Sequence, residues 1–252
     1  LTAYNTPHET TPFHLIKTEH FEPAVLVGME EQNREIEEII NNPETPTFTN
    51  TIVALERSGK TLDRITTVFG NLLSAETNDE MQAIAERIMP QLTEHSNNIS
   101  LNEKLFSRIK SVYESKEKES LNQEESMLLN KTYDGFIRSG ANLSDEHKER
   151  LRKLSSELSV LTLKFSQNNL KEKNSYELPL TLEQLEGLPD SALVAYAQTA
   201  KDKGKEDYIV TLEAPSFIPF MKYCKNRELR EQLYRAYNTQ CTHDNEYNNL
   251  DI

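Results

Sequence analysis

The stretch SDEHKERLRKLSSELSVLTLKFSQNN, residues 144–169, decides the fold class of this chain. Its apolar residues recur at steps of three and four and so line one face of a helix; they are Leu151, Leu154, Leu158, Leu161 and Phe165. Ser144 is a favoured residue at a helix start, and the pattern lasts until about Asn169. The stretch therefore predicts one long helix whose apolar seam packs in a coiled-coil-like helical hairpin.

Similar helical patterns fill the residues before this helix. Asn78 is a suitable N-cap for one of them, and Gly140 is a suitable stop before Ser144. Pro90 falls inside a pattern, so we expect a kink or a break there. The apolar positions that define these helices run over Val25–Ile40 (after Pro23), Ile52–Leu72, Met81–Leu92, Leu105–Val112 and Leu128–Ile137.

The pattern changes to a period of two after residue 172. Tyr176, Leu178 and Leu180 alternate with polar neighbours, and so do Tyr208, Val210 and Leu212, which predicts two strands. Between them, residues 188–203 form a helical pattern that follows Pro189 and is closed by Gly204, and a helical pattern returns beyond Pro219 and through 226–237. Two strands alone are marginally stable, so this ribbon must pack on the helices.

These patterns predict a mainly α fold, a multi-helix array with long antiparallel helical hairpins and one small two-stranded β ribbon. Two regions are expected. Residues 1–172 form an N-terminal helical region, and residues 173–252 hold the β ribbon with its helical insertion and the helices that follow.

Composition excludes some partners. The chain of 252 residues has 41 acidic and 28 basic side chains, a net charge of −13, and nine acidic against two basic residues lie in positions 1–50. Binding to a phosphate backbone needs a basic surface, so we expect no nucleic-acid partner. No apolar run approaches the roughly 20 residues of a membrane span, so we expect no membrane partner. The opening LTAYNTPHETTPF lacks an initiator Met and a leader pattern, and we interpret it as a processed or trimmed start.

The two cysteines, Cys224 and Cys241, leave three readings open: one bridge, two free thiols, or half of a metal site. Free thiols are the expected state in a chain this poor in cysteine. Cys224 could act as a nucleophile only beside an oriented histidine, so a structural thiol next to Tyr223 is favoured.

No metal or catalytic motif is visible. A zinc hydrolase would carry HExxH, two imidazoles one helical turn apart, but no histidine here has a second one four residues away. In TEHFE (18–22), TEHSN (93–97) and DEHKE (145–149) the acid precedes the histidine, so His20, His95 and His147 are interpreted as surface or capping residues. His8, His14 and His20 lie six apart, which suits neither a helix nor a strand face, and His243 stands apart from them.

Nucleophile and phosphate-binding motifs are absent too, since the sequence contains no GxSxG, GxGxxG or phosphate loop. The paired carboxylates Glu30-Glu31, Glu37-Glu38 and Glu124-Glu125 fit solvated helix faces, because two acids make chemistry only when one of them is buried. We therefore predict no catalytic residue and no metal ligand in this chain.

The helix at 226–237 has two readings. Arg227, Arg230 and Arg235 carry fork-shaped donors that could contact the carboxylate or backbone of a peptide, as could Tyr234 or Tyr237. The alternative is a packed amphipathic helix. Its apolar stripe would hold Leu229, Leu233, Tyr234 and Tyr237, and its arginines would pair with acidic neighbours such as Glu228 or Glu231. The second reading is favoured, because a tyrosine stripe at helical spacing usually belongs to a core.

Seven strings, in order along the chain, closely resemble the amino-terminal half of the M3 family of zinc oligopeptidases. The resemblance runs from about Phe13 to Tyr237, and its nearest branch is the peptidyl-dipeptidases, with oligopeptidase A as a close cousin. The strings are PFHLIKTEHFEPA (12–24), PTFTNTIVALERSGKTLDRI (46–65), LLSAETNDEMQAI (72–84), LTEHSNNISLNEKLF (92–106), TYDGFIRSGANLS (132–144), LSSELSVLTLKFSQN (154–168) and NRELREQLYRAY (226–237).

The resemblance implies a helical, two-lobed enzyme with a deep channel for short, unstructured peptides. In this family the zinc is held by HExxH and a downstream glutamate in the carboxy-terminal half, and the peptidyl-dipeptidases release dipeptides from the C-terminus of a peptide. None of those positions is present, so no catalytic or metal-binding role is carried onto this chain, and its substrate-binding residues stay unknown.

The resemblance therefore predicts an amino-terminal, channel-wall part of a zinc peptidyl-dipeptidase, inactive alone, whose zinc and carboxy-terminal catalytic half lie beyond Ile252. Residues 173–252 would lead into the helices of that catalytic part. Two alternatives stay open: an endopeptidase of the oligopeptidase A type as the parent, or a stand-alone, non-catalytic helical binding module. Family members occur in the bacterial cytoplasm and as exported proteins, so the compartment also stays open.

Overall fold

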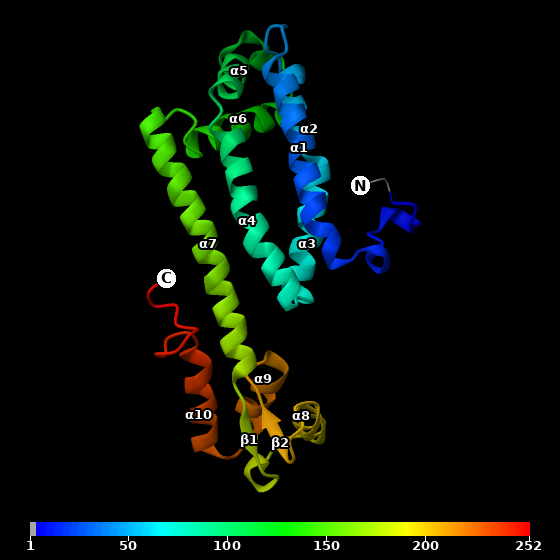
Figure 1. The fold of residues 1–252 in the computed structure, drawn as a ribbon, viewed down its shortest axis with the longest axis vertical. Helices are drawn as coiled ribbons and strands as arrows, with labels where there is room; N and C mark the ends of the chain where they lie inside the picture. The colour runs from blue at the N-terminus through cyan, green and yellow to red at the C-terminus, as the bar shows by residue number, and fades with distance from the viewer. Residues whose placement is uncertain (1–3) are drawn as a thin grey trace. The chain divides into compact units, whose positions relative to one another are not determined.

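The structure, a computed structural model, describes residues 4–252, and of Glu117 only the backbone. It forms two compact units, residues 1–160 and residues 161–252, and the long helix α7 (Asp145–Ser175) contributes to both. Within residues 4–252, Figure 1 shows helices and one small two-stranded β ribbon, which confirms the predicted mainly α class. The division into regions 1–172 and 173–252 that the sequence suggested stays a prediction.

The first unit is an array of helices around α1 (Phe21–Ile40), which packs against α3, α4 and α5. One of its cores joins α1, α5 and α6 with the turn before α2, and its buried members are Ile36, Ile39, Phe48, Ile52, Leu105, Ile109, Val112 and Leu129. The helices after α1 are α2 (Ala54–Arg57), α3 (Lys60–Ala75), α4 (Asp79–Ser100), α5 (Glu103–Glu114) and α6 (Gln123–Arg138). Short helical turns lie at Pro7–Glu9, Phe13–Leu15, Thr18–His20 and Lys116–Ser120.

The pattern expected over Ile52–Leu72 is not one continuous helix. A π-helical turn, η4 (Phe48–Val53), leads into α2, and the chain then bends at Gly59 before α3 begins. Gly59 has a φ of 71°, and its N–H donates to the Glu35 carboxylate over 2.7 Å. The apolar period continues through the bend because both pieces pack on α1.

The expected helix starts and stops are otherwise close to the observed ones. The Asn78 side chain accepts from the Met81 N–H over 2.9 Å at the start of α4, and Gly140 follows α6 with a φ of 92°. Of the kink or break expected at Pro90, the break does not occur, since α4 continues through the proline to Ser100. Buried residues on both sides of the proline, Ile88 and His95, hold the two halves of α4 in the unit.

Two expectations for α7 need correction. The helix extends to Ser175 instead of ending near Asn169, because Asn168 and Glu172 are buried in the second unit and make side-chain hydrogen bonds there. The apolar seam is also only partly covered within residues 4–252, where Leu151 and Leu161 are half-buried. Leu154, Leu158 and Phe165 are 52%, 64% and 49% exposed.

The second unit packs helices on the ribbon, as expected. Strands β1 (Leu178–Leu180) and β2 (Tyr208–Val210) pair antiparallel, with Pro179 opposite Ile209. Between them lie a turn at Glu183–Leu185 and helix α8 (Asp190–Asp202), and after them come α9 (Ala214–Tyr223) and α10 (Arg227–Asn238). The buried core of this unit is formed by Leu178, Leu180, Leu185, Ala192, Tyr196, Val210, Leu212, Phe220, Cys224 and Leu233.

The close approach at Gly187 gives a test of this second core. Gly187 has a φ of 99°, and a Cβ there would lie 2.5 Å from the Tyr223 carbonyl oxygen. Gly204 also has a positive φ, 66°, but no described neighbour lies within 4 Å of its Cβ position. We expect Gly204→Ala to cost about 1–2 kcal/mol from backbone strain alone.

Gly187→Ala should cost about 1–3 kcal/mol more than Gly204→Ala, because it adds a steric clash to the same strain. Urea unfolding followed by circular dichroism measures both free energies of unfolding. Equal losses in the two variants would show that the contact with Tyr223 does not limit this turn.

Candidate functional site

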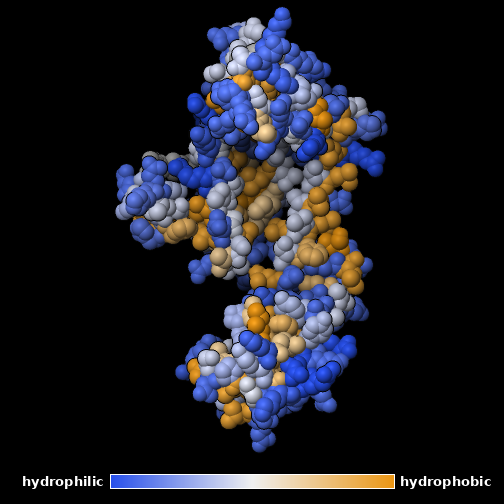
Figure 2. Space-filling view, turned by 180° about the vertical axis from the view of Figure 1, so that it is seen from behind, coloured by the Kyte–Doolittle hydropathy of each residue, from blue (hydrophilic) through white to orange (hydrophobic). Residues whose placement is uncertain are grey.

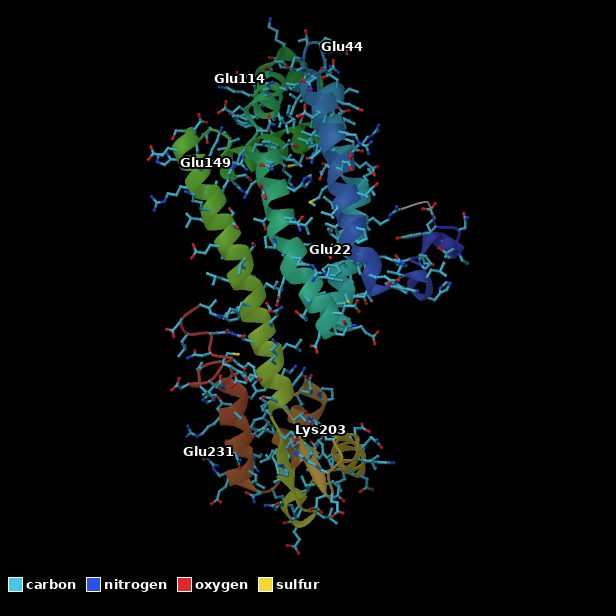
Figure 3. The ribbon with its side chains drawn as sticks, in the orientation of Figure 1. Glu22, Glu44, Glu114, Glu149, Lys203 and Glu231 are labelled. Carbon is cyan, nitrogen blue, oxygen red and sulfur yellow. The ribbon has the colours of Figure 1, made fainter. Side chains whose placement is uncertain are left out.

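The helix that offered the one functional reading from sequence, α10, is largely occupied by structural contacts. Leu233 is fully buried, Arg230 donates to the Cys224 carbonyl, and Arg235 pairs with Glu231 at 2.7 Å. Glu231 is visible on this helix in Figure 3. The Tyr237 ring stacks on Phe217 with centroids 4.2 Å apart. The burial of Leu233 and the Arg235–Glu231 pair agree with the packed-helix reading, but Tyr234 and Tyr237, expected in its apolar stripe, are 54% and 40% exposed.

Arg235 and Tyr237 are exposed although they make these contacts. Arg227 and Tyr234 are the exposed candidates on α10 that lie outside them, and Tyr234 is 54% exposed. Arg227 lies in the first turn, just after Asn226, whose side chain caps the helix. Neither residue is placed against a general base or a second basic side chain by any contact that the structure records among residues 4–252. They can contact a ligand, but they do not by themselves form a site.

Most histidines lie at the surface, as expected. His20 accepts from the Lys17 N–H over 3.2 Å, and His147 lies 3.0 Å from the Ser144 hydroxyl at the start of α7. His243 contacts Thr239 at 3.1 Å, and His8 and His14 lie exposed in short turns. Among residues 4–252, no three His, Cys, Asp or Glu side chains gather closely enough to hold a metal ion.

His95 departs from the surface role expected for it. It is 7% exposed in α4, and its Nε2 lies 2.7 Å from the Gln32 amide oxygen on α1, a distance at which the ring N–H donates. Burial lowers the pKa of His95, because the charged form loses its hydration there. His95 is thus a neutral packing residue that links two helices of the first unit.

Both thiols are free, as predicted, and both are buried. Cys224 lies 3.6 Å from the Gln184 carbonyl, inside the core of the second unit. Cys241 has a φ of 57°, and its N–H donates to the Glu172 carboxylate. Burial, followed by the contact with Glu172, raises the pKa of Cys241 to about 11, so this thiol is not a nucleophile at neutral pH.

The paired carboxylates lie on helix faces, as expected. Glu31 accepts from Thr61 at 3.0 Å, Glu37 accepts from Asn41 at 2.8 Å, and Glu125 accepts from the Asn122 N–H at 3.0 Å. These are structural contacts of carboxylates with uncharged donors, two of them local and the one between Glu31 and Thr61 joining α1 to α3. No acid–base pair of the kind used in catalysis results from them.

The sequence patterns did not predict one cavity that is lined largely by polar residues. It lies in the second unit, holds about 420 Å³, and collects side chains from the end of α7, from α8 and from the start of α9. Lys173 and Glu213 form an ion pair of 3.0 Å at its wall, and Lys203, visible in Figure 3, pairs with Glu177 at 2.8 Å. No sequence spacing could reveal the cavity, because its walls come from three separate segments.

The polar groups of this cavity are mostly satisfied by one another. Tyr196 donates to the Ser216 carbonyl over 2.8 Å, and the Ser216 hydroxyl accepts from the Thr211 N–H over 2.9 Å. Burial raises the pKa of Tyr196 to about 12, so its hydroxyl stays protonated as a donor. The arrangement can hold polar groups without covalent chemistry.

Comparisons with known proteins add information that the geometry does not contain. The chain is 34% identical over 232 residues to a dipeptidyl carboxypeptidase of Salmonella typhimurium, a match that covers 91% of this chain. It is 34% identical over 235 residues to the dipeptidyl carboxypeptidase of Escherichia coli and 30% identical over 243 residues to oligopeptidase A of Salmonella typhimurium. No family model matches the chain.

The chain spans about a third of the length of these relatives, 34% of both carboxypeptidases and 35% of oligopeptidase A. None of the helices described in residues 4–252 has the length and apolarity needed to cross a membrane.

His95 gives a prediction for stability against pH. Because its folded pKa lies below its unfolded value of about 6.5, the unfolded chain binds a proton in this range that the folded chain does not. The free energy of unfolding should therefore fall as pH decreases from 7.5 to 5.5, by up to about 1.4 kcal/mol per pH unit. His95→Gln should flatten this dependence in urea titrations. The exposed His147→Gln is the control and should leave it unchanged.

Glu172 gives a prediction for thiol reactivity. It accepts from the Cys241 N–H, and Asn245 also donates to it over 3.4 Å, so it fixes the chain after α10. Glu172→Gln should loosen this segment and raise the labelling rate of Cys241 by maleimide at least about tenfold, while Cys224 stays protected. Peptide mass mapping separates the two thiols. Glu177→Gln, an ion-pair change in the same unit, should not expose Cys241.

Proposed function

Since this chain is a member of the M3 oligopeptidase family by homology to its amino-terminal part, we propose that it forms part of the channel wall of a zinc peptidyl-dipeptidase. The enzyme would release dipeptides from the C-terminus of short peptides. The observation that carries this proposal is the match at 34% identity over nine-tenths of the chain to two dipeptidyl carboxypeptidases.

In this proposal the chain forms part of the channel wall and contributes no catalytic residue. Among its acids and histidines, Glu31 contacts Thr61 and His95 contacts Gln32, and both contacts join helices. The described residues offer no group of three metal ligands, so they do not fit a zinc ion. The zinc of the proposed enzyme would be held by residues outside this sequence, and we derive no catalytic step from residues 4–252.

Sequence identity slightly favours a dipeptidyl carboxypeptidase over an oligopeptidase A as the parent enzyme. Identity to the first group is 34%, and to the bacterial oligopeptidases A it is 30–33%. The difference is small, and the match to one oligopeptidase A covers 96% of this chain. An endopeptidase of that type is therefore the second candidate.

The test uses the product of the complete reading frame that contains this sequence. With an N-acetylated pentapeptide that has a free C-terminus, we expect zinc-dependent release of the C-terminal dipeptide, and amidation of the C-terminus should abolish it. Internal cleavage of both peptides would favour the endopeptidase. Mass spectrometry of the products distinguishes the outcomes.

The 252-residue chain alone should cleave neither peptide, because no zinc ligands gather among its described residues. If the 252-residue chain hydrolysed either peptide and a chelator abolished this activity, the result would contradict the proposal that the zinc ligands lie outside this sequence. A reading frame whose product shows no zinc-dependent peptidase activity would contradict the proposed function itself.

A further inference from the structure

The middle of α7 carries apolar side chains that no part of the described chain covers. Leu154, Leu158 and Val160 are 52%, 64% and 50% exposed, and we call these three residues the α7 surface. Figure 2 shows the corresponding hydrophobic colour along this helix. Large apolar side chains that are exposed on one helix usually mark a surface on which another element or partner packs.

Comparison with α1 shows that this exposure is not that of an ordinary solvated helix. The exposed side of α1 is rich in charge, as in EEQNREIEE at 30–38. The stretch LSSELSVLTL at 154–163 contains a single charged residue, Glu157. Charged residues are what water-facing helix surfaces ordinarily present, so the composition of α7 fits a covered helix.

The exposed residues also lie on more than one side of the helix. Leu154 and Leu158 are four residues apart and share a face. Val160 follows Leu158 by two residues, which turns its side chain by about 200° around the helix axis. A covering element must therefore reach two opposite sides of α7.

We propose that the α7 surface is enclosed by polypeptide corresponding to the remaining two thirds of the M3 oligopeptidases, an inference that rests on the proposed function. The relatives are about three times as long as this chain and match it over nine-tenths of its length, so they contain the mass needed to cover it. A second copy of the chain fits less well, because a two-fold dimer buries the same single patch on both copies.

The test compares labelling of Leu158→Cys in the 252-residue chain and in the product of the complete reading frame. The two native thiols are buried, so the introduced cysteine gives the main maleimide signal. We expect labelling at least about tenfold slower in the longer protein, because the site becomes reachable only by local opening. Rates are normalised to those of each protein in guanidinium.

Glu149→Cys is the matched control on the same helix. Its native side chain is 69% exposed on the charged first turns of α7, and Glu149 is labelled in Figure 3. It should react at similar rates in the two proteins. Leu154→Ser combined with Leu158→Ser should leave the Tm of the short chain unchanged and lower that of the longer protein by about 5 °C or more.

Equal labelling of Leu158→Cys in both proteins would overturn the proposal. So would protection that already appears in the short chain as its concentration rises, because it would assign the surface to a second copy. A reading frame that stops at residue 252 would overturn it as well. Labelling does not require peptidase activity, so a protected α7 surface in an inactive long product would support this inference while contradicting the proposed function.

Discussion

The first unit depends on how closely α1 and α3 approach each other. Gly28 lies at their contact, where a Cβ would come within 3.1 Å of the Leu62 Cα, and Val25, one turn earlier, is fully buried. Single helices of this length are marginal in water, so their stability comes from shared apolar faces. Because α1 also packs on α4 and α5, its position sets the positions of the other helices in this unit.

The second unit meets a different constraint, because its strands have only three residues each and cannot be stable by themselves. Helices α8 and α9 cover β2, and Tyr196 ties α8 to the start of α9 through its hydroxyl. Buried polar groups complete the unit. Asn168 and Glu172 on α7 hold the chain after α10 through Asn249 and Cys241. Hydrogen bonds between buried groups fix a segment that has little apolar content to pack.

Periodicity predicted most of this architecture, since a helical stripe or an alternating strand states locally which face will be buried. The bend at Gly59 was not predictable from local sequence, because the Gly59 N–H donates a hydrogen bond to the carboxylate of Glu35, 24 positions away. The surface position predicted for His95 is wrong for a similar reason, since its hydrogen-bond partner Gln32 lies on another helix. The polar cavity beside Lys173 and Glu213 needs three segments at once, which no local pattern encodes.

The proposed function connects two features of the chain, the lack of a catalytic pattern in its sequence and the exposed apolar residues in the middle of α7. A channel between two lobes places its chemistry on one lobe and can leave the other as a shaped wall, so the wall keeps helix patterns and carries no ligand spacing. The same division requires the wall to present apolar surface to its neighbour. Leu154, Leu158 and Val160 then look unexplained only when α7 is considered within residues 4–252. Sequence periodicity predicts a packing seam on α7 that includes Leu154 and Leu158, but a local pattern does not identify the element that would pack there.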